Sequence, residues 1–437
     1  MKQTLFQNAR IILPDRVLER GNLLTEGDRI RAIWTDGAER VTEETESSWA
    51  DGERRREETE SSRADGERRA EGAEISREAE IVDLRGQYLA PGFIDIHVHG
   101  GGGGDFMDAE RESWQQAMTA HLRHGTTAMC PTTLTASPEE MERVFSLYRE
   151  MEREERETGP RLLGLHMEGP YITESMKGAQ NAAYIRRPEK GLTEWLLEKS
   201  RGALRILTMA PELEGAGEAA RMAREAGILL SAGHSDGRLE DVEQAVRDGY
   251  TMATHLYSSM STIIRENGMR RPGVLEAALL LDELDVEVIG DGMHLPPSLL
   301  KLIVKTKGPE RMILVTDAMR AAGLGSGYYK LGSRKEGQTV WSDGKVARMP
   351  DGISFAGSIA TADRLIRVMH EEAEVPVWQA VAMMTKNPAR ALGETEIGVL
   401  APGKKADLVA FDEKIRISRV YRDGVAQVIA EDNADKV

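Results

Sequence analysis

Two histidines one residue apart end an apolar run in the first quarter of the chain. The stretch GFIDIHVHGGGGGDF, residues 92–106, places His97 and His99 at the end of a predicted buried strand. In a strand, residues i and i+2 point to the same side, so both imidazoles face one place. Two neutral rings that converge suit a metal ion, and the alternative is a pair of hydrogen-bonded histidines at a strand end.

Further metal-binding side chains follow other apolar runs. Each lies at or just past the carboxyl end of a run that we interpret as a strand; they are Glu168, His234, His255, His294 and Asp317. Imidazole nitrogens and carboxylate oxygens without thiolates suit Zn, Fe or another divalent transition metal. Such a metal lowers the pKa of water toward about 7 and polarises a carbonyl.

Two of these residues are predicted to act on the substrate. Asp317, in LVTDAM, is placed to accept the proton of the water and to hand it to a leaving amine. Its alternative role is a helix N-cap. His294, in DGMHLPP, lies slightly outside its strand and is better placed to touch substrate than to bind the metal.

The other histidines have simpler interpretations. His121, His124 and His370 lie in helical patterns, which indicates surface or packing roles. His166 alternates with Glu168 and is predicted to support the metal ligands from behind.

Eight apolar runs alternate with helical patterns between about residues 91 and 392. The runs are GFIDIHVH, GTTAMCPT, RLLGLHMEG, LRILTMAP, GILLSAGHS, YTMATHLYS, VEVIGDGMH and RMILVTDAM. Eight strand–helix units predict a (β/α)8 TIM barrel, whose catalytic groups lie at the carboxyl ends of the strands.

The two ends of the chain read as short strands. We expect residues 1–90 and 393–437 to pair as one small β-sandwich domain, with the barrel over 91–392. Residues 43–56 and 57–70 are a tandem repeat, EETESSWADGERRR and EETESSRADGERRA. We interpret about 41–80 as a polar insertion, disordered or partly helical, and an interaction arm is the alternative.

Composition bounds the class of protein. The 437 residues carry a formal charge of −16, which opposes binding to nucleic acid or to an anionic membrane. No apolar run is long enough to cross a bilayer, and no amino-terminal signal segment is present. Cys130 is the only cysteine, which excludes internal disulfides and agrees with a cytoplasmic protein.

The order and spacing of several stretches carry a resemblance. These are PGFIDIHVHG, GTTAMCPT, HMEGPYI, KGAQN, SAGHS, HLYSSM, DGMHLPP, LVTDAM, FAGS, NPARALG and GVLAPGKKADLVAFD. Together they resemble the N-acetylglucosamine-6-phosphate deacetylases of the amidohydrolase superfamily, through nearly the whole chain outside the repeat. The resemblance implies an amidohydrolase-type barrel and a homodimer.

The resemblance also implies roles for the residues at the strand ends. Glu168, His234 and His255 would bind the principal metal, in a barrel whose fourth strand has no lysine to be carboxylated. Asp317 would be the catalytic acid and base, and His294 would orient or polarise the amide carbonyl. By the same resemblance, His97 and His99 would bind a second metal bridged by Glu168, so one or two divalent metals per subunit are expected.

Substrate contacts are carried over from the same family. The residues expected to contact the substrate are Ala179, Gln180, Ser258, Ser259, Arg270, Asp291, His294, Phe355, Ala356 and Gly357. The family usually has Asn-Ala where this chain has the serine pair at 258–259, at positions that help to hold the phosphate. The arginine of the family's usual R-E-P-G stretch falls on Arg270, after a few inserted residues. Arg265 is a second candidate for the same phosphate contact.

The predicted reaction is metal-dependent hydrolysis of the acetamide of N-acetylglucosamine-6-phosphate, a small phosphorylated amino sugar. The serine pair keeps open a second reaction, on another N-acyl amino sugar or a cyclic amide. A non-catalytic scaffold is the third reading, and the intact set of ligands argues against it.

Overall fold

The computed structural model describes residues 1–35, 41–42, 75–154, 159–352 and 354–427. It forms two compact units, one of Phe93–Gly393 and one of Met1–Gly92 with Glu394–Val437. The tandem repeat over 43–70, and with it most of the predicted insertion, lies outside the described residues.

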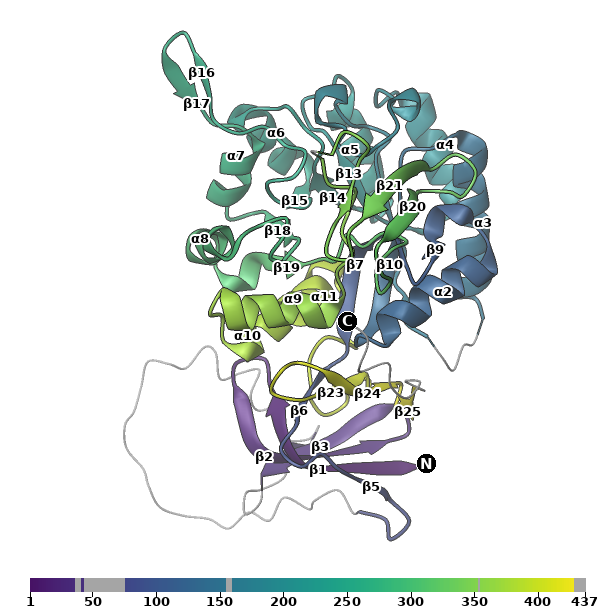
Figure 1. The fold of residues 1–437 in the computed structure, drawn as a ribbon, viewed down its shortest axis with the longest axis vertical. Helices are drawn as coiled ribbons and strands as arrows, with labels where there is room; N and C mark the ends of the chain where they lie inside the picture. The colour runs from purple at the N-terminus through teal and green to yellow at the C-terminus, as the bar shows by residue number, and fades with distance from the viewer. Residues whose placement is uncertain (36–40, 43–74, 155–158, 353, 428–437) are drawn as a thin grey trace. The chain divides into compact units, whose positions relative to one another are not determined.

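The unit made from both chain ends is built on one sheet (Figure 1). Its order is β25(Val425–Ala426), β24(Ile417–Arg422), β23(Leu408–Phe411), β6(Tyr88–Pro91), β1(Gln3–Ile12), β2(Val17–Glu26), β3(Arg29–Thr35) and β4(Val41–Thr42), and β5(Glu80–Asp83) pairs with β1. The antiparallel pairing of β6 with β23 joins the two ends of the chain.

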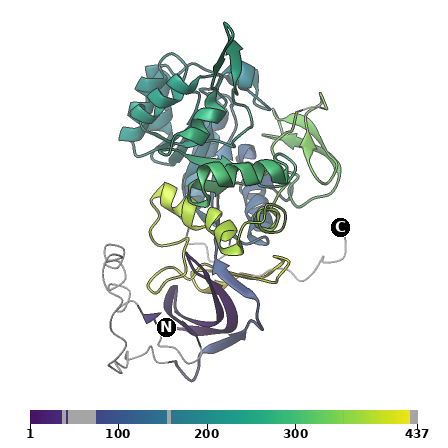
Figure 2. The ribbon, with the colours of Figure 1, turned by 90° about the vertical axis from the view of Figure 1, so that its left-hand side faces the viewer.

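This sheet curls around its own core. The rings of Phe6 on β1 and Tyr421 on β24 lie 4.9 Å apart, edge to face. Three strand spacings separate β1 from β24, about 14 Å in a flat sheet. The strong curvature of β1 and β2 is visible in Figure 2. The curl lets Leu23, Leu89 and Leu408 from separate strands share one buried cluster, in the manner of a small sandwich.

The second unit contains the predicted barrel. Its parallel strands are β7(Phe93–Val98), β10(Thr126–Thr133), β11(Arg161–Leu162) continued by β12(Leu165–Glu168), β13(Leu204–Met209), β14(Leu229–Ala232), β15(Tyr250–Ala253), β18(Asp285–Val288) and β19(Met312–Leu314). Each of the eight predicted runs overlaps one of these strands, and the barrel prediction is confirmed. The strands are buried on both faces, which explains their near-continuous apolar sequences.

A side chain helps to close the barrel between its first and last strands. Asp95 on β7 accepts hydrogen bonds from the Thr316 backbone N–H at 3.2 Å and the Thr316 hydroxyl at 2.5 Å. The Asp317 N–H donates to the His97 carbonyl at 2.8 Å. Complete burial raises the pKa of Asp95 to about 7. This seam places β7 and the segment after β19 side by side, so their functional residues meet.

Helices surround the strands (Figure 1). They are α2(Arg111–Leu122), α3(Pro138–Glu152), α4(Lys190–Ser200), α5(Ala216–Glu225), α6(Leu239–Asp248), α7(Val274–Leu280), α8(Pro297–Lys307), α9(Ala362–Arg367), α10(Val377–Met383) and α11(Lys386–Leu392). Local signals set their ends: α3 starts with a capping box between Ser137 and Glu140, and α6 stops at Gly249, whose φ is +105°.

Two insertions extend the loops at the carboxyl ends of the strands. The hairpin of β16(Ile264–Glu266) and β17(Met269–Arg271) projects from the barrel after β15 (Figure 1). After β19, a three-stranded sheet of β20(Gly327–Leu331), β21(Gln338–Ser342) and β22(Ala347–Arg348) shares a buried cluster with Met319 and Ala356. Arg270 lies on β17 of this hairpin.

Candidate active site

The strand ends bring the predicted metal-binding residues together. Glu168 ends β12, while His234 and His255 each stand two residues beyond β14 and β15. The metal-ligand atoms of these three residues lie within 4.8 Å of one another, as do those of His97, His99 and Asp317. All six side chains are buried.

Backbone strain is concentrated in three of these residues. His234, His255 and Asp317 have φ angles of +49°, +25° and +47°. Such conformations cost a non-glycine residue on the order of 1–3 kcal/mol. Each occurs where the chain leaves a strand and turns. The surrounding fold therefore holds these three residues in place against a local preference.

The first group centres on one carboxylate oxygen. Glu168 Oε1 lies 2.8 Å from His234 Nε2 and 2.9 Å from His255 Nε2, and the two nitrogens are 3.2 Å apart. His234 Nδ1 is 2.8 Å from the carbonyl of Met176. A carbonyl only accepts, so Nδ1 carries the proton and the neutral ring offers the Nε2 lone pair to the site.

The second group faces the first across the same glutamate. His99 Nε2 lies 3.1 Å from Asp317 Oδ1 and 3.4 Å from Glu168 Oε2. His97 Nε2 lies 3.6 Å from Asp317 Oδ1 and 3.7 Å from Glu168 Oε1. Glu168 thus stands between the two groups: Oε1 lies near His234, His255 and His97, and Oε2 lies near His99.

These residues fit a divalent metal. His97 Nε2 is completely buried and has no hydrogen-bond partner, although it points at two carboxylates. A buried polar atom of this kind needs a ligand. Nitrogen and carboxylate donors from four histidines, Glu168 and Asp317 are the set that zinc and iron accept.

When no metal is bound, protons on the buried side chains take over part of the charge compensation. Burial would lower the pKa of His255, but its hydrogen bond to Glu168 and the Glu168 charge outweigh burial and raise it to about 9. Burial dominates at His97 and lowers its pKa to about 4. For Asp317, burial is opposed by the His99 hydrogen bond and by nearby histidine charge, and the net effect lowers the pKa. Asp317 is therefore ionised at neutral pH and is able to accept a proton.

His294 is held at the rim by a carboxylate. Its Nδ1 lies 2.9 Å from Asp291 Oδ2, while Asp291 Oδ1 accepts the backbone N–H groups of Met293 and His294. Burial opposes ionisation of Asp291, but these contacts hold its pKa below the usual value. The ring packs edge to face on Phe355 at 4.8 Å, and Nε2 remains for a substrate.

A cavity of about 270 Å³ joins these groups. Its lining residues are His99, Leu134, Glu168, Gly178, Ala179, Gln180, His234, His255, Ser258, Ser259, His294, Asp317, Leu331, Ser354, Phe355 and Gly357. No lysine or arginine belongs to this lining among the residues that the structure describes. The volume suits one small molecule.

Some predicted substrate contacts lie elsewhere. Ala356 is fully buried in the cluster beneath the three-stranded sheet, because adjacent residues point to opposite sides of the segment. Arg270 is exposed on β17, where it pairs with Arg265 across the hairpin. Asp291 lies behind His294 and holds it, as the 2.9 Å contact shows.

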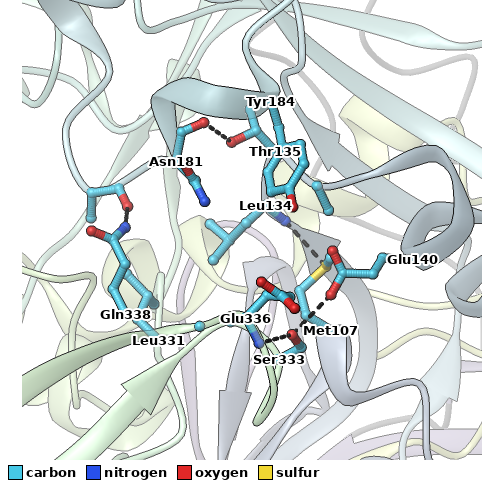
Figure 3. Close-up of a pocket in the computed structure, with 14 residues that line it drawn as sticks. Met107, Leu134, Thr135, Glu140, Asn181, Tyr184, Leu331, Ser333, Glu336 and Gln338 are labelled. Carbon is cyan, nitrogen blue, oxygen red and sulfur yellow. Dashed lines mark hydrogen bonds between the residues drawn. The ribbon is translucent and has the colours of Figure 1, made fainter.

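A smaller pocket of about 30 Å³ (Figure 3) shares Leu134, Ala179 and Leu331 with the lining of the cavity. Hydrogen bonds join its lining residues. Gln338 Nε2 donates to the Ala179 carbonyl at 2.5 Å, and the Thr135 hydroxyl donates to the Asn181 carbonyl at 3.2 Å. The space holds about one water molecule. These contacts fasten the loop that carries Ala179 to β21 and to the segment that follows β10.

Two contacts were missed from the sequence. Gln180 donates to Glu168 Oε2 at 2.6 Å, so it holds a metal ligand besides lining the cavity. Glu287, in the middle of β18, lies 2.9 Å from His97 Nδ1. The sequence contains a sign of this contact: Glu287 stands between Val286 and Val288 in a predicted buried strand, where an acidic side chain requires a partner.

The remaining four histidines do not line the cavity. His121 is buried with Nε2 2.9 Å from the Gly100 carbonyl, and His124 is 3.0 Å from Asp363. His370 Nδ1 lies 2.9 Å from the Val375 carbonyl. His166 is fully buried below the site, and its ring stands 4.5 Å from that of His97.

A (β/α)8 barrel with a buried histidine and carboxylate cluster at the carboxyl ends of its strands defines a metal-dependent hydrolase. Residues 88–435 match the amidohydrolase family. The chain is 36% identical over 354 residues to the N-acetylglucosamine-6-phosphate deacetylase of Bacillus subtilis, covering 80% of this chain and 86% of that protein. It is 32% identical over 347 residues to an N-acetylgalactosamine-6-phosphate deacetylase of Escherichia coli O157:H7, covering 79% and 89%.

Solved structures support the same family. The fold is similar to that of an N-acetylglucosamine-6-phosphate deacetylase variant from Mycobacterium smegmatis in complex with N-acetylglucosamine-6-phosphate. The TM-score is 0.81 at 29% identity, over 98% of this chain and 99% of that one. The chain belongs to the amidohydrolase family and, within it, to the N-acetylglucosamine-6-phosphate deacetylases.

Proposed function

We propose that this chain hydrolyses the acetamide of N-acetylglucosamine-6-phosphate to glucosamine-6-phosphate and acetate. One observation carries the proposal: Glu168, His234 and His255 converge beside an ionised Asp317 on a cavity that fits one small molecule. The relatives named above, which act on phosphorylated N-acetyl sugars, support the substrate class.

Glu168, His234 and His255 would hold the principal metal, and His97 with His99 a second one. When bound, Zn or Fe supplies Lewis acidity, which lowers the pKa of water and polarises a carbonyl. Zn and Fe are both proposed because imidazole and carboxylate ligands accept either.

The protein groups perform the proton transfers. Asp317 takes one proton from the attacking water, and later gives it to the sugar nitrogen as the C–N bond breaks. His294, whose Nδ1 is committed to Asp291, directs Nε2 at the acetamide oxygen. An Nε2–H donor at this position would stabilise the negative charge that develops on that oxygen. The products are a free amine and acetic acid, which ionises to acetate by releasing the second proton of the water.

The sugar and its phosphate would meet the other lining residues. Ala179, Gln180, Phe355 and Gly357 bound the cavity, which supports a role in holding the sugar. The hydroxyls at 258–259 are proposed to donate hydrogen bonds to the phosphate.

Arg270 is a separate proposal for phosphate recognition, since it is exposed on β17 and does not line the cavity. An Arg270→Ala variant with a raised KM for the phosphorylated sugar alone would support it. An equal effect on the unphosphorylated sugar would contradict it.

Acetate release by the purified protein tests the reaction. The substrates are N-acetylglucosamine with and without the 6-phosphate, and N-acetylgalactosamine-6-phosphate as a second candidate. The 32% identity to a deacetylase of the galactose epimer favours including the latter. We expect the phosphorylated glucose form to have the highest kcat/KM; equal rates with and without phosphate would reject the proposed substrate.

We also propose a cytoplasmic homodimer, in which residues 91–392 carry the whole site and residues 1–90 with 393–437 form the β-sandwich domain. The single buried cysteine supports a reducing compartment. No helix among the described residues has the length and apolar character needed to cross a membrane. Light scattering after size-exclusion chromatography measures the oligomer, and a monomer at micromolar concentration would reject the dimer.

A further inference from the structure

Glu287 is a fully buried carboxylate that forms no ion pair with a lysine or arginine among the described residues. The residue is 0% exposed in β18, and its ion-pair neighbours among the described residues are the histidines at 97 and 166. Leaving a carboxylate in the barrel interior is costly unless hydrogen bonds compensate it. The hydrogen bonds that Glu287 makes therefore indicate what role it has in the site.

Those contacts go to ligands of both metal groups. Glu287 Oε2 lies 2.9 Å from His97 Nδ1 and 3.3 Å from the backbone nitrogen of His255. Its other oxygen has no hydrogen-bond partner. Burial raises the pKa of Glu287 to about 7, so at pH 8 the carboxylate is mainly ionised and only accepts; the 2.9 Å contact then puts the proton of a neutral His97 ring on Nδ1. The lone pair is then on Nε2, the buried atom that faces Glu168 and Asp317.

His166 does not compete for this role. Its Nδ1 lies 2.9 Å from the Ile96 carbonyl and its Nε2 lies 2.7 Å from the Thr208 hydroxyl. The carbonyl fixes the proton on Nδ1, so Nε2 accepts from Thr208. Both nitrogens are thus occupied. The residues His97, His166 and Glu287 are close enough for a third metal group, but they form the support beneath the second one.

We propose that Glu287 is the positioning residue of the second metal site, because it fixes the His97 tautomer and ring orientation that present Nε2 to the metal. The bond to the His255 backbone also ties this support to the principal site. The inference rests on the two-metal site proposed above, but not on the identity of the substrate.

The metal test uses Glu287→Leu and Glu287→Gln in the full chain. Leucine removes the acceptor, and glutamine keeps an oxygen for His97 Nδ1–H. Thr208→Val is the matched control, since it alters a hydrogen bond of the same buried layer without touching His97. Zn binding to metal-free protein is measured by calorimetry, and bound metal is counted by elemental analysis.

Loss of a partner behind a metal-binding histidine typically weakens binding about 10- to 100-fold. We therefore expect the second Zn to bind about 10- to 100-fold more weakly in Glu287→Leu, with two sites retained in Glu287→Gln and Thr208→Val. Two sites of unchanged affinity in Glu287→Leu would overturn the proposal. An equal loss in Thr208→Val would assign the effect to packing and would overturn it as well.

A second measurement does not depend on whether the leucine variant folds. Nitrogen-15 labelling of the nine histidines allows the ring tautomers of the metal-free wild-type chain to be read by NMR at pH 8, with His97→Gln identifying the signal. We expect His97 to carry its proton on Nδ1. A proton on Nε2 would overturn the proposal even if acetate release confirms the reaction, and a failed acetate assay leaves the tautomer result standing.

Discussion

Metal uptake by the metal-free protein should depend steeply on pH between 7 and 9. His255 has a pKa raised to about 9 by Glu168, so at pH 7 its Nε2 site is protonated. A metal needs the neutral imidazole and must displace this proton. Because the pKa is raised, the proton opposes binding below pH 9 and no longer does so above it.

The size of this pH effect follows from the His255 pKa of about 9. Displacing a proton two pH units below the pKa costs about 2.7 kcal/mol, at about 1.36 kcal/mol per unit. Affinity for the principal metal should therefore be about 100-fold lower at pH 7 than above pH 9. His97 adds nothing to this slope, since its pKa of about 4 leaves it neutral throughout the range.

The assay is competition between the metal-free protein and a chelator of known pH dependence, from pH 6.5 to 9.5. Calorimetry in two buffers of different ionisation enthalpy counts the released protons. We expect about one proton or more per principal metal at pH 7, with fewer released at pH 9.5. Binding of equal strength at pH 7 and pH 9, with no proton release at pH 7, would refute the assigned protonation of His255.

Three further predictions concern single positions. Asp317→Asn should lower kcat about 10²- to 10⁴-fold, since a proton carrier is removed; acetate release measures it, and wild-type activity would reject the assigned role. His97→Ala and His99→Ala should each lower the bound metal toward one per subunit by elemental analysis, and unchanged content would mean that these rings only pack or hydrogen-bond. Arg320→Met should lower the free energy of unfolding by roughly 3 kcal/mol, because Asp108, with a 1% exposed side chain and a 2.8 Å contact to Arg320, loses its buried partner; urea denaturation measures this, and a change below about 1 kcal/mol would contradict it.

Much of the fold and site was predictable because the barrel repeats one simple pattern. Each strand is an apolar run, and the functional residues stand where such runs end. His97, Glu168 and Asp317 could therefore be placed on one rim without knowing the strand order.

Other features depend on contacts between distant parts of the chain. Glu287 and His97 are 190 positions apart, and their pairing exists only once the barrel has closed. Phe355 lines the cavity while its neighbour Ala356 is buried behind it, a difference set by the packing of the three-stranded sheet. Arg270 could be matched to a motif, but the hairpin on which it stands is too short to have a recognisable periodic pattern.

The pairing of β6 with β23 has a consequence for the order in which the protein folds during synthesis. Leu408 pairs with Pro91, so the sheet of the terminal unit lacks its last three strands until more than 300 further residues have been translated. At about 5–20 residues per second, that interval is roughly 15–60 s. The whole barrel segment is translated within this interval. During that time the edge of β6 that later pairs with β23 has no partner strand. A nascent chain stopped before residue 408 should accordingly leave the amino-terminal strands sensitive to protease, and release of the full chain should protect them.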